Sequence, residues 1–299
     1  MASSQSSTIS IHEDVDFFRE AVLFTAGQTG MNPALVEKDY YCSVLLAYLY
    51  EHEDTQLVFR GGTSLGKIYA DFYRLSEDLD FVISTPSGAP RSERRKRMAP
   101  VKEWLSNIPS KISVFELPEG IRGYNNSKQY IASVSYNALV AITDEPAQVR
   151  IEVGLREALL VPPVREKVRT LLLNPFTKSP AVVEFDALVL ALEEAYAEKI
   201  WAALTRREPA IRDFYDINYA VARLDLDLKD PYLIELVIKK LKVPDNDPID
   251  ISHSRKAELQ TQLDTRLKPV LRRQDFEKFA LDRAFELVAE MGSRIMDKG

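Results

Sequence analysis

The residue types best suited to chemistry are gathered in one short segment, between Leu57 and Ser84. A glycine pair is followed there by two hydroxyl residues: Gly61, Gly62, Thr63 and Ser64. Glycines at a strand-to-helix turn let an anion approach the backbone N–H groups, and hydroxyls add donors. Two carboxylates, Asp78 and Asp80, come next. Because the first group suits phosphates and the second suits divalent cations, the segment predicts a nucleotide-handling site, although a glycine pair alone is also typical of an ordinary turn.

The spacing of Asp78 and Asp80 predicts a metal-binding strand face. Residues two apart in a strand point to the same side, so both carboxylates would face one way. Leu79, Phe81 and Ile83 would then face the core. Two carboxylates so close repel each other unless a cation lies between them, and oxygen ligands of this kind suit Mg²⁺. The alternative is the exposed face of an edge strand.

Three residues near these motifs are further candidates for the nucleotide phosphates. Arg74 suits a phosphate, but it suits a pairing with Glu77 or Asp78 equally well. Ser76 suits phosphate binding or a turn cap. Lys67 follows the glycines on a predicted helix, where a solvated lysine is the simpler interpretation.

Glu152 is the best candidate for a third carboxylate. It lies in a predicted strand where Val149, Ile151 and Val153 form the apolar set, so it shares the other face with Arg150. A third acidic ligand would complete a two-metal arrangement. The alternative is a solvent-facing glutamate.

The second half of the chain carries its own cluster of charges on two predicted helices. Lys199 falls on an apolar stripe, where its amine needs a partner such as phosphate, Asp213 or Asp216. The two aspartates are three apart and share a face of the following helix. Arg206 and Arg207 lie in the connecting turn and suit a triphosphate, although surface arginines are also common beside a proline turn.

A basic segment continues into the helix that is predicted from Arg91 onward. Its members are Arg91, Arg94, Arg95, Lys96 and Arg97. With a net charge of −6 the 299-residue chain has no general attraction for polyanions, so contact with nucleic acid needs a local patch of this kind. No aromatic residues are interleaved, so base stacking is not indicated. The alternative is an ordinary solvated helix face.

Hydrophobic periodicity and turn residues predict an α+β first part and a mainly helical second part, divided into residues 1–165 and 166–299. We expect strands at 56–59, 79–84, 111–117, 130–142 and 148–155. A helix capped by Asn32 with Pro33 in its first turn precedes them, and others are expected at 63–73 and from Arg91 onward. Beyond the Val161-Pro162-Pro163 segment we expect helices at 187–204, 211–224 and 232–241, and two more within 254–299.

The composition predicts a cytoplasmic protein. Cys42 is the one cysteine, which excludes an intramolecular disulfide, and we expect its thiol to be buried in a helix. The first ten residues lack the pattern of a signal peptide. No apolar run reaches the roughly 20 residues that a membrane span needs, so we expect no membrane association.

The order and spacing of five segments resemble the AbiEii/AbiGii toxin family. FRGGTSLGKIY and RLSEDLDF are similar to the glycine and double-aspartate motifs of that family. VEKDYYCSVLL, VRIEVGLRE and EKIWAALTRREPAIRDFYDI are similar to further family segments, so the resemblance covers roughly residues 33–220. It implies a nucleotidyltransferase-like mixed-sheet domain followed by a helical domain, with the active site in the cleft between them.

The resemblance also implies roles for residues. Asp78 and Asp80 would be catalytic metal ligands, the Gly61–Ser64 segment would hold nucleotide phosphates, and Lys199 with Asp213 would be the essential pair of the helical half. Where Glu152 stands, many polymerase-type transferases have an aspartate, so its metal role is less well supported.

The implied function is that of a bacterial toxin from a toxin–antitoxin system. It would be a Mg²⁺-dependent nucleotidyltransferase, with Mn²⁺ as a substitute ion, that transfers nucleotides from an NTP to RNA, notably the tRNA 3′ acceptor end. Such transfer would block translation and growth, and a cognate antitoxin would be a partner. Two alternatives remain open: transfer to a small-molecule acceptor, and a non-catalytic module that binds nucleotide or RNA.

Overall fold

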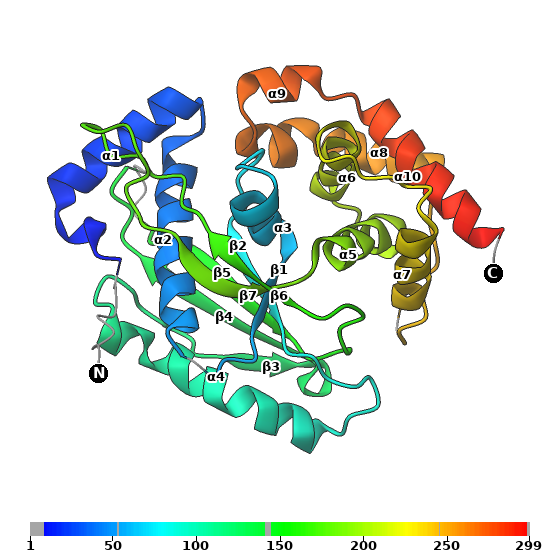
Figure 1. Ribbon diagram of the computed structural model, residues 1–299, viewed down its shortest axis with the longest axis horizontal. Coiled ribbons are helices and arrows are strands. Elements are labelled where there is room, and N and C mark those ends of the chain that lie inside the picture. The colour runs from blue at the N-terminus through cyan, green and yellow to red at the C-terminus, as the bar shows by residue number, and fades with distance from the viewer. Residues whose placement is uncertain (1–8, 53, 141–144, 245, 298–299) are drawn as a thin grey trace. The chain divides into compact units, whose positions relative to one another are not determined.

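The computed structural model describes residues 9–52, 54–140, 145–244 and 246–297 (Figure 1). The chain forms two compact units. The first unit comprises Met1–Leu159 and Pro163–Val189, and the second comprises Leu160–Pro162 and Leu190–Gly299. The first unit therefore extends beyond the division at residue 165 that the sequence predicted. The second unit is made of two separate stretches of the chain.

The first unit is built on one mixed sheet of seven strands in the order β3-β4-β5-β2-β1-β7-β6. The pairs β2–β5 and β1–β7 are parallel, and the other described pairs are antiparallel. The strands are β1 (Val58–Arg60), β2 (Asp78–Val82), β3 (Arg122–Tyr124), β4 (Gln129–Tyr136), β5 (Ala147–Gly154), β6 (Val164–Val168) and β7 (Phe185–Val189). This mixed α+β architecture confirms the predicted fold class.

Four helices accompany this sheet in the described part of the first unit: α1 (Val15–Thr29), α2 (Pro33–Tyr50), the short α3 (Gly61–Ser64) and α4 (Arg91–Lys111) (Figure 1). Side chains of α1, α2 and α4 form one apolar core with the sheet, and this core includes Leu79, Phe81, Ile151 and Val153. These four strand residues are at most 1% exposed. The faces of β2 and β5 are therefore divided as the period-two pattern predicted.

Helix α2 begins and packs as its sequence requires. The Asn32 side chain accepts a hydrogen bond from Ala34 N at 2.9 Å, and Pro33 occupies the first turn. Cys42 is fully buried, as predicted. Glu37 and Asp39 of this helix are also buried. Glu37 accepts the Leu139 and Val140 amides, so its charge is met by backbone donors. Burial nevertheless raises the pKa of Glu37 above its ordinary value.

Several predicted elements are wrong at the margins of the sheet. Residues 111–117 contribute a single bridge, Glu116 to Ser135, because α4 continues to Lys111. Strand β3 lies between the predicted strands 111–117 and 130–142, and β6 and β7 lie within the part predicted to be helical. The predicted end of the strand 130–142 falls outside the described residues.

The second unit is helical, as predicted. Its helices are α5 (Leu192–Thr205), α6 (Ile211–Arg223), α7 (Pro231–Leu241), α8 (His253–Thr261), α9 (Arg273–Lys278) and α10 (Leu281–Met296). Helices α6 and α10 pack through Phe214 and Phe285, whose rings stack 5.9 Å apart. Within the described residues of either unit, no helix combines the length and apolar character that crossing a bilayer requires.

Candidate functional site

A row of charged side chains crosses three neighbouring strands of the first unit. Arg60 on β1 pairs in register with Asp80 on β2, and Asp80 pairs with Glu152 on β5. Residues in register point to the same face, so the three side chains share one side of the sheet. Asp78 lies on this side too, while Leu79 and Phe81 point into the core. The sequence therefore predicted the common face of the two aspartates correctly.

The glycine pair lies directly against this carboxylate face. Gly61 directly follows β1 and has a φ of +79°. A Cβ built on Gly61 would overlap the Asp80 carboxylate and would lie 3.1 Å from Asp80 Cγ. The Thr63 hydroxyl donates to the Asp78 carbonyl oxygen at 2.5 Å. Gly61 thus lets the backbone approach Asp80, and Thr63 fixes the short helix α3 to β2. The hydrogen of the Thr63 hydroxyl is therefore already used within the protein and is not free to donate to a nucleotide phosphate.

Arg74 and Ser76 approach the second glycine. A Cβ on Gly62 would overlap the Arg74 guanidinium and lie 3.1 Å from Ser76 Oγ. Arg74 is 3% exposed, and its Nη1 donates to the Leu75 carbonyl oxygen at 3.2 Å. These two residues therefore lie against the second glycine, and their role in phosphate binding stays a prediction. Ser64 is also buried there, at 3% exposed.

Lys67 lies elsewhere. It is 1% exposed in the π-helical turn Leu65–Tyr69, and its ammonium group is 2.7 Å from Asp39 Oδ1 and 2.8 Å from Ser43 Oγ on α2. The sequence predicted that Lys67 is either solvated or a ligand of the nucleotide phosphates, and this buried position matches neither prediction. A buried ion pair explains it better, because a buried ammonium needs a close anionic partner.

The carboxylate pair fits a magnesium ion, whereas Glu152 does not complete a cage. Among the described residues, no group of three or more acidic, histidine or cysteine side chains is arranged to hold a metal ion. Mg²⁺ in nucleotide enzymes commonly takes one or two carboxylates and fills its other positions with water and substrate phosphates. Asp78 and Asp80 on one strand face supply that donor set.

The second unit contains a separate buried charge cluster. Lys199 Nζ is 2.8 Å from Asp213 Oδ1 and 3.0 Å from Asp216 Oδ2, and Arg206 Nη1 is 3.1 Å from Asp213 Oδ2. Asp213 and Asp216 are buried, at 3% and 0% exposed. Burial by itself would raise the pKa of Asp213, but Lys199 and Arg206 outweigh it and hold that pKa below its ordinary value. Arg207 is exposed in the turn after α5.

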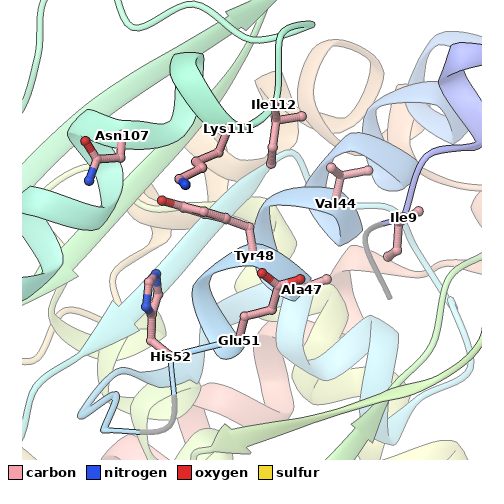
Figure 2. A pocket seen from close by; sticks show the side chains of 9 residues that line it. All are labelled: Ile9, Val44, Ala47, Tyr48, Glu51, His52, Asn107, Lys111 and Ile112. Carbon is pink, nitrogen blue, oxygen red and sulfur yellow. The ribbon is translucent and has the colours of Figure 1, made fainter. Parts of the chain in front are cut away.

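A pocket of about 430 Å³ in the first unit contains none of the predicted site residues. Figure 2 shows its lining side chains, which include Tyr48 of α2, Glu51 and His52 directly after that helix, and Lys111 of α4. The His52 ring stacks on Trp104 at 4.2 Å, and burial lowers the pKa of His52. This pocket has no pair of carboxylates and no glycine turn, so its chemistry differs from that of the β1–β2–β5 face.

The comparison with protein families decides the relationship of the chain. A family model described as "Nucleotidyl transferase AbiEii toxin, Type IV TA system" matches residues 44–290. The chain belongs to this AbiEii family. It is accordingly a toxin nucleotidyltransferase of a type IV toxin–antitoxin system. The motifs predicted the toxin nucleotidyltransferase but not the type of the system.

Solved structures with a similar fold are also known. MenT4, a nucleotidyltransferase toxin from Mycobacterium tuberculosis H37Rv, is 20% identical with a TM-score of 0.60, covering 93% of this chain and 89% of that one. A putative nucleotidyltransferase from H. pylori is 16% identical, with a TM-score of 0.48 and coverage of 86% and 94%. JHP933 from Helicobacter pylori is 16% identical, with a TM-score of 0.47 and coverage of 86% and 90%. A search among curated proteins gave no match.

Two arginines on the carboxylate face of the sheet were not among the site residues that the sequence predicted. Arg60 precedes the glycine pair and stands in register with Asp80, and Arg150 stands in register with Asp78. Both could have been found from strand alternation, because Arg60 is next to the core residue Phe59 and Arg150 is two residues from Glu152. Their pairing across strands could not, because the strand order is not written in the local pattern.

Gly61→Ala should damage the site more than the fold. The new methyl group meets the Asp80 carboxylate, and the positive φ adds about 1–2 kcal/mol of strain. We expect nucleotide transfer to be lost while the chain still folds. Gly27→Ala is the matched control, because nothing lies within 4 Å of its Cβ position in α1, and it should stabilise the chain by about 0.5–1 kcal/mol. Full transfer activity in Gly61→Ala, measured beside thermal unfolding, would contradict the close approach.

Proposed function

We propose that this AbiEii-family toxin is a divalent-metal-dependent enzyme that transfers a nucleotide from an NTP to RNA, with the tRNA 3′ acceptor end as target. The observation that carries this proposal is the approach of the Gly61 backbone to the face that bears Asp78 and Asp80. A phosphate-binding turn beside two carboxylates suits the substrate of such a reaction.

The first unit would bind and orient the nucleotide. The residues proposed for the phosphates are Gly61, Gly62, Thr63, Ser64, Arg74 and Ser76. Asp78 and Asp80 would hold Mg²⁺ or Mn²⁺, which when bound neutralises phosphate charge and lowers the pKa of an attacking hydroxyl. An acceptor oxygen then forms a bond to the α-phosphorus. The bond between the α-phosphorus and the oxygen that bridges to the β-phosphate breaks, and pyrophosphate leaves with that oxygen.

For the second unit the proposal assigns Lys199 and Asp213 as an essential pair. Arg206 and Arg207 at the end of α5 would contact phosphates of the substrate, while Lys199 is held by Asp213 and Asp216. Modification of tRNA would block translation in the cytoplasm, and a cognate antitoxin would restrain it.

The decisive experiment incubates the purified chain with total RNA and each α-labelled NTP in turn, with Mg²⁺, with Mn²⁺ and with a chelator. We expect label in tRNA-sized RNA from at least one NTP and none with the chelator. Label in a small product instead would replace RNA by a small acceptor, and no incorporation with any NTP would point to a binding module.

The basic surface of α4 should contribute to RNA binding through fewer residues than the sequence predicted. Arg94 is buried and donates to the Leu155 and Ser87 carbonyl oxygens, and Arg97 pairs with Glu93 at 2.7 Å. Arg91, Arg95 and Lys96 remain exposed.

Replacing Arg91, Arg95 and Lys96 together with alanine should weaken RNA modification in a salt-dependent way, with the salt slope of binding falling by about 2–3. Binding titrations with tRNA at several salt concentrations measure this slope. The control removes three exposed charges of the second unit, Lys268, Arg273 and Lys278, and should change the slope less. Equal behaviour of the two triple variants would remove α4 from the RNA-binding surface.

A further inference from the structure

Both oxygens of Glu152 are already engaged. Oε1 accepts a hydrogen bond from Gln129 Nε2 at 2.6 Å, and Oε2 lies 2.8 Å from Arg150 Nη2. The side chain is only 18% exposed. A metal ion on this carboxylate would lie beside the Arg150 guanidinium, and two cations at that range repel each other. The third carboxylate is thus better matched to an arginine than to a metal.

Arg150 is the more accessible partner of this pair, with a side chain 44% exposed. It stands in register with Asp78 and so shares the face that bears Asp78 and Asp80. Its ion pair with Glu152 limits the orientations of its guanidinium, which presents several donors in a fixed plane. An oriented, half-exposed arginine next to two carboxylates suits a phosphate group of a substrate.

The strand order indicates which substrate this is. Strand β2 lies between β1 and β5, and helix α3 with the glycine pair follows β1. Arg150 therefore lies on the opposite side of the aspartates from the glycine turn. In phosphoryl transfer the attacking and leaving oxygens are roughly in line across the phosphorus. If the leaving pyrophosphate lies by the glycine turn, the acceptor approaches from the β5 side.

We propose that Glu152 is a positioning residue that holds Arg150 against a backbone phosphate of the acceptor RNA, and that it is not a ligand of the metal ion. This inference rests on the proposed function, because it assumes an RNA acceptor and a nucleotide at the glycine turn. In this arrangement Asp78 and Asp80 bind the metal ion of the nucleotide site, whereas Arg150 on β5 binds the acceptor and Glu152 holds Arg150 in place.

The metal arm of the test measures Mn²⁺ binding to the full chain by electron paramagnetic resonance. Glu152→Gln keeps the shape of the side chain and should leave the Mn²⁺ affinity within about twofold of the wild type. Asp80→Asn should lower that affinity at least about tenfold, because it removes a carboxylate ligand. A loss in Glu152→Gln as large as that in Asp80→Asn would overturn the proposal.

The acceptor arm measures steady-state kinetics with NTP and tRNA varied separately. Arg150→Gln should raise KM for tRNA about tenfold and lower the salt slope of tRNA binding by about 0.7–1, with the KM for NTP unchanged. Arg150→Lys, which keeps the charge, should restore the slope. Arg19→Gln is the control, since Arg19 is an exposed arginine of α1 that pairs with Asp16 at 3.5 Å. A raised KM for NTP alone in Arg150→Gln would overturn the assignment to the acceptor.

A double-mutant cycle separates positioning from an independent role. If Glu152 acts through Arg150, Glu152→Gln should also raise KM for tRNA, and the double variant should be no worse than Arg150→Gln alone. Additive effects would contradict the positioning role. If the wild-type chain transfers no nucleotide to RNA, the proposed function fails, whereas direct tRNA binding by the same variants still tests Arg150.

Discussion

Asp80→Ala should abolish nucleotide transfer and toxicity while the chain folds normally. Asp80 lies on the polar face of β2, in register with Arg60 and Glu152, so the substitution removes a carboxylate without opening the apolar core. Loss of a metal ligand removes several kcal/mol of transition-state stabilisation, which corresponds to about 10³-fold or more in rate. Labelled-NTP transfer at matched soluble yield measures the effect.

Asp186→Asn provides the control for this variant. Asp186 lies in β7 of the same sheet and pairs with Lys167 at 2.9 Å on the surface, with a side chain 56% exposed. It changes the charge of the first unit by the same amount and should leave transfer intact. Transfer or toxicity retained in Asp80→Ala would remove the aspartate pair from the mechanism.

Lys199→Met should destabilise the second unit strongly. The substitution leaves Asp213 and Asp216 buried together, and of the two cations described in this cluster Arg206 still pairs with Asp213. Removing one partner of a buried ion pair costs about 3–5 kcal/mol. The chain has two tryptophans, Trp104 in the first unit and Trp201 in the second. In a Trp104→Phe background, denaturant titration followed by the fluorescence of Trp201 therefore reports the second unit.

Lys239→Met is the control for Lys199→Met. Lys239 pairs with Glu235 one turn away on the exposed face of α7, where the ammonium group is solvated. Its removal should leave the Trp201 transition where it is. An unchanged transition in Lys199→Met as well would show that the cluster contributes nothing to the stability of the second unit.

The same cluster gives the second unit an acid sensitivity. The pKa of Asp213 is lowered in the folded state from an ordinary value of 3.8, because Lys199 and Arg206 offset the effect of burial. A lowered carboxyl pKa stabilises the fold above that ordinary value, and this contribution is lost as the pH falls below it. Acid titration of the Trp201 signal should show the loss below about pH 4, and in Lys199→Met it should begin at a higher pH.

The sequence predicted the parts of the site that depend on local periodicity. Asp78 and Asp80 share a face because strand side chains alternate, and Asp213 and Asp216 share a helix face because they are three residues apart. An anionic partner for Lys199 was expected, but phosphate, Asp213 and Asp216 were left open, and the structure places both aspartates beside the amine. These inferences need only the neighbours along the chain.

The parts that failed depend on partners far away in sequence. Lys67 is buried because Asp39, 28 residues earlier on α2, meets it. Arg94 is buried because the Leu155 carbonyl oxygen accepts from it. Strand β6 was missed because it lies at the edge of the sheet and is largely exposed, so its sequence VREKV lacks an apolar alternation. Strand β7 was read as the beginning of α5 because its apolar residues run on into that helix.

The short visit of Leu160–Pro162 to the second unit has a practical consequence for dissecting this toxin. The Leu160 and Val161 amides donate to the Glu194 carboxylate, which also pairs with the buried Lys240 at 2.7 Å. A fragment that stops at Val189 leaves those two amides without their acceptor. A fragment that starts at Leu190 leaves the Glu194 carboxylate without these two donors. The two units therefore do not correspond to two continuous stretches of the chain, and an exchange of the second unit between relatives must include Leu160–Pro162 together with the helices.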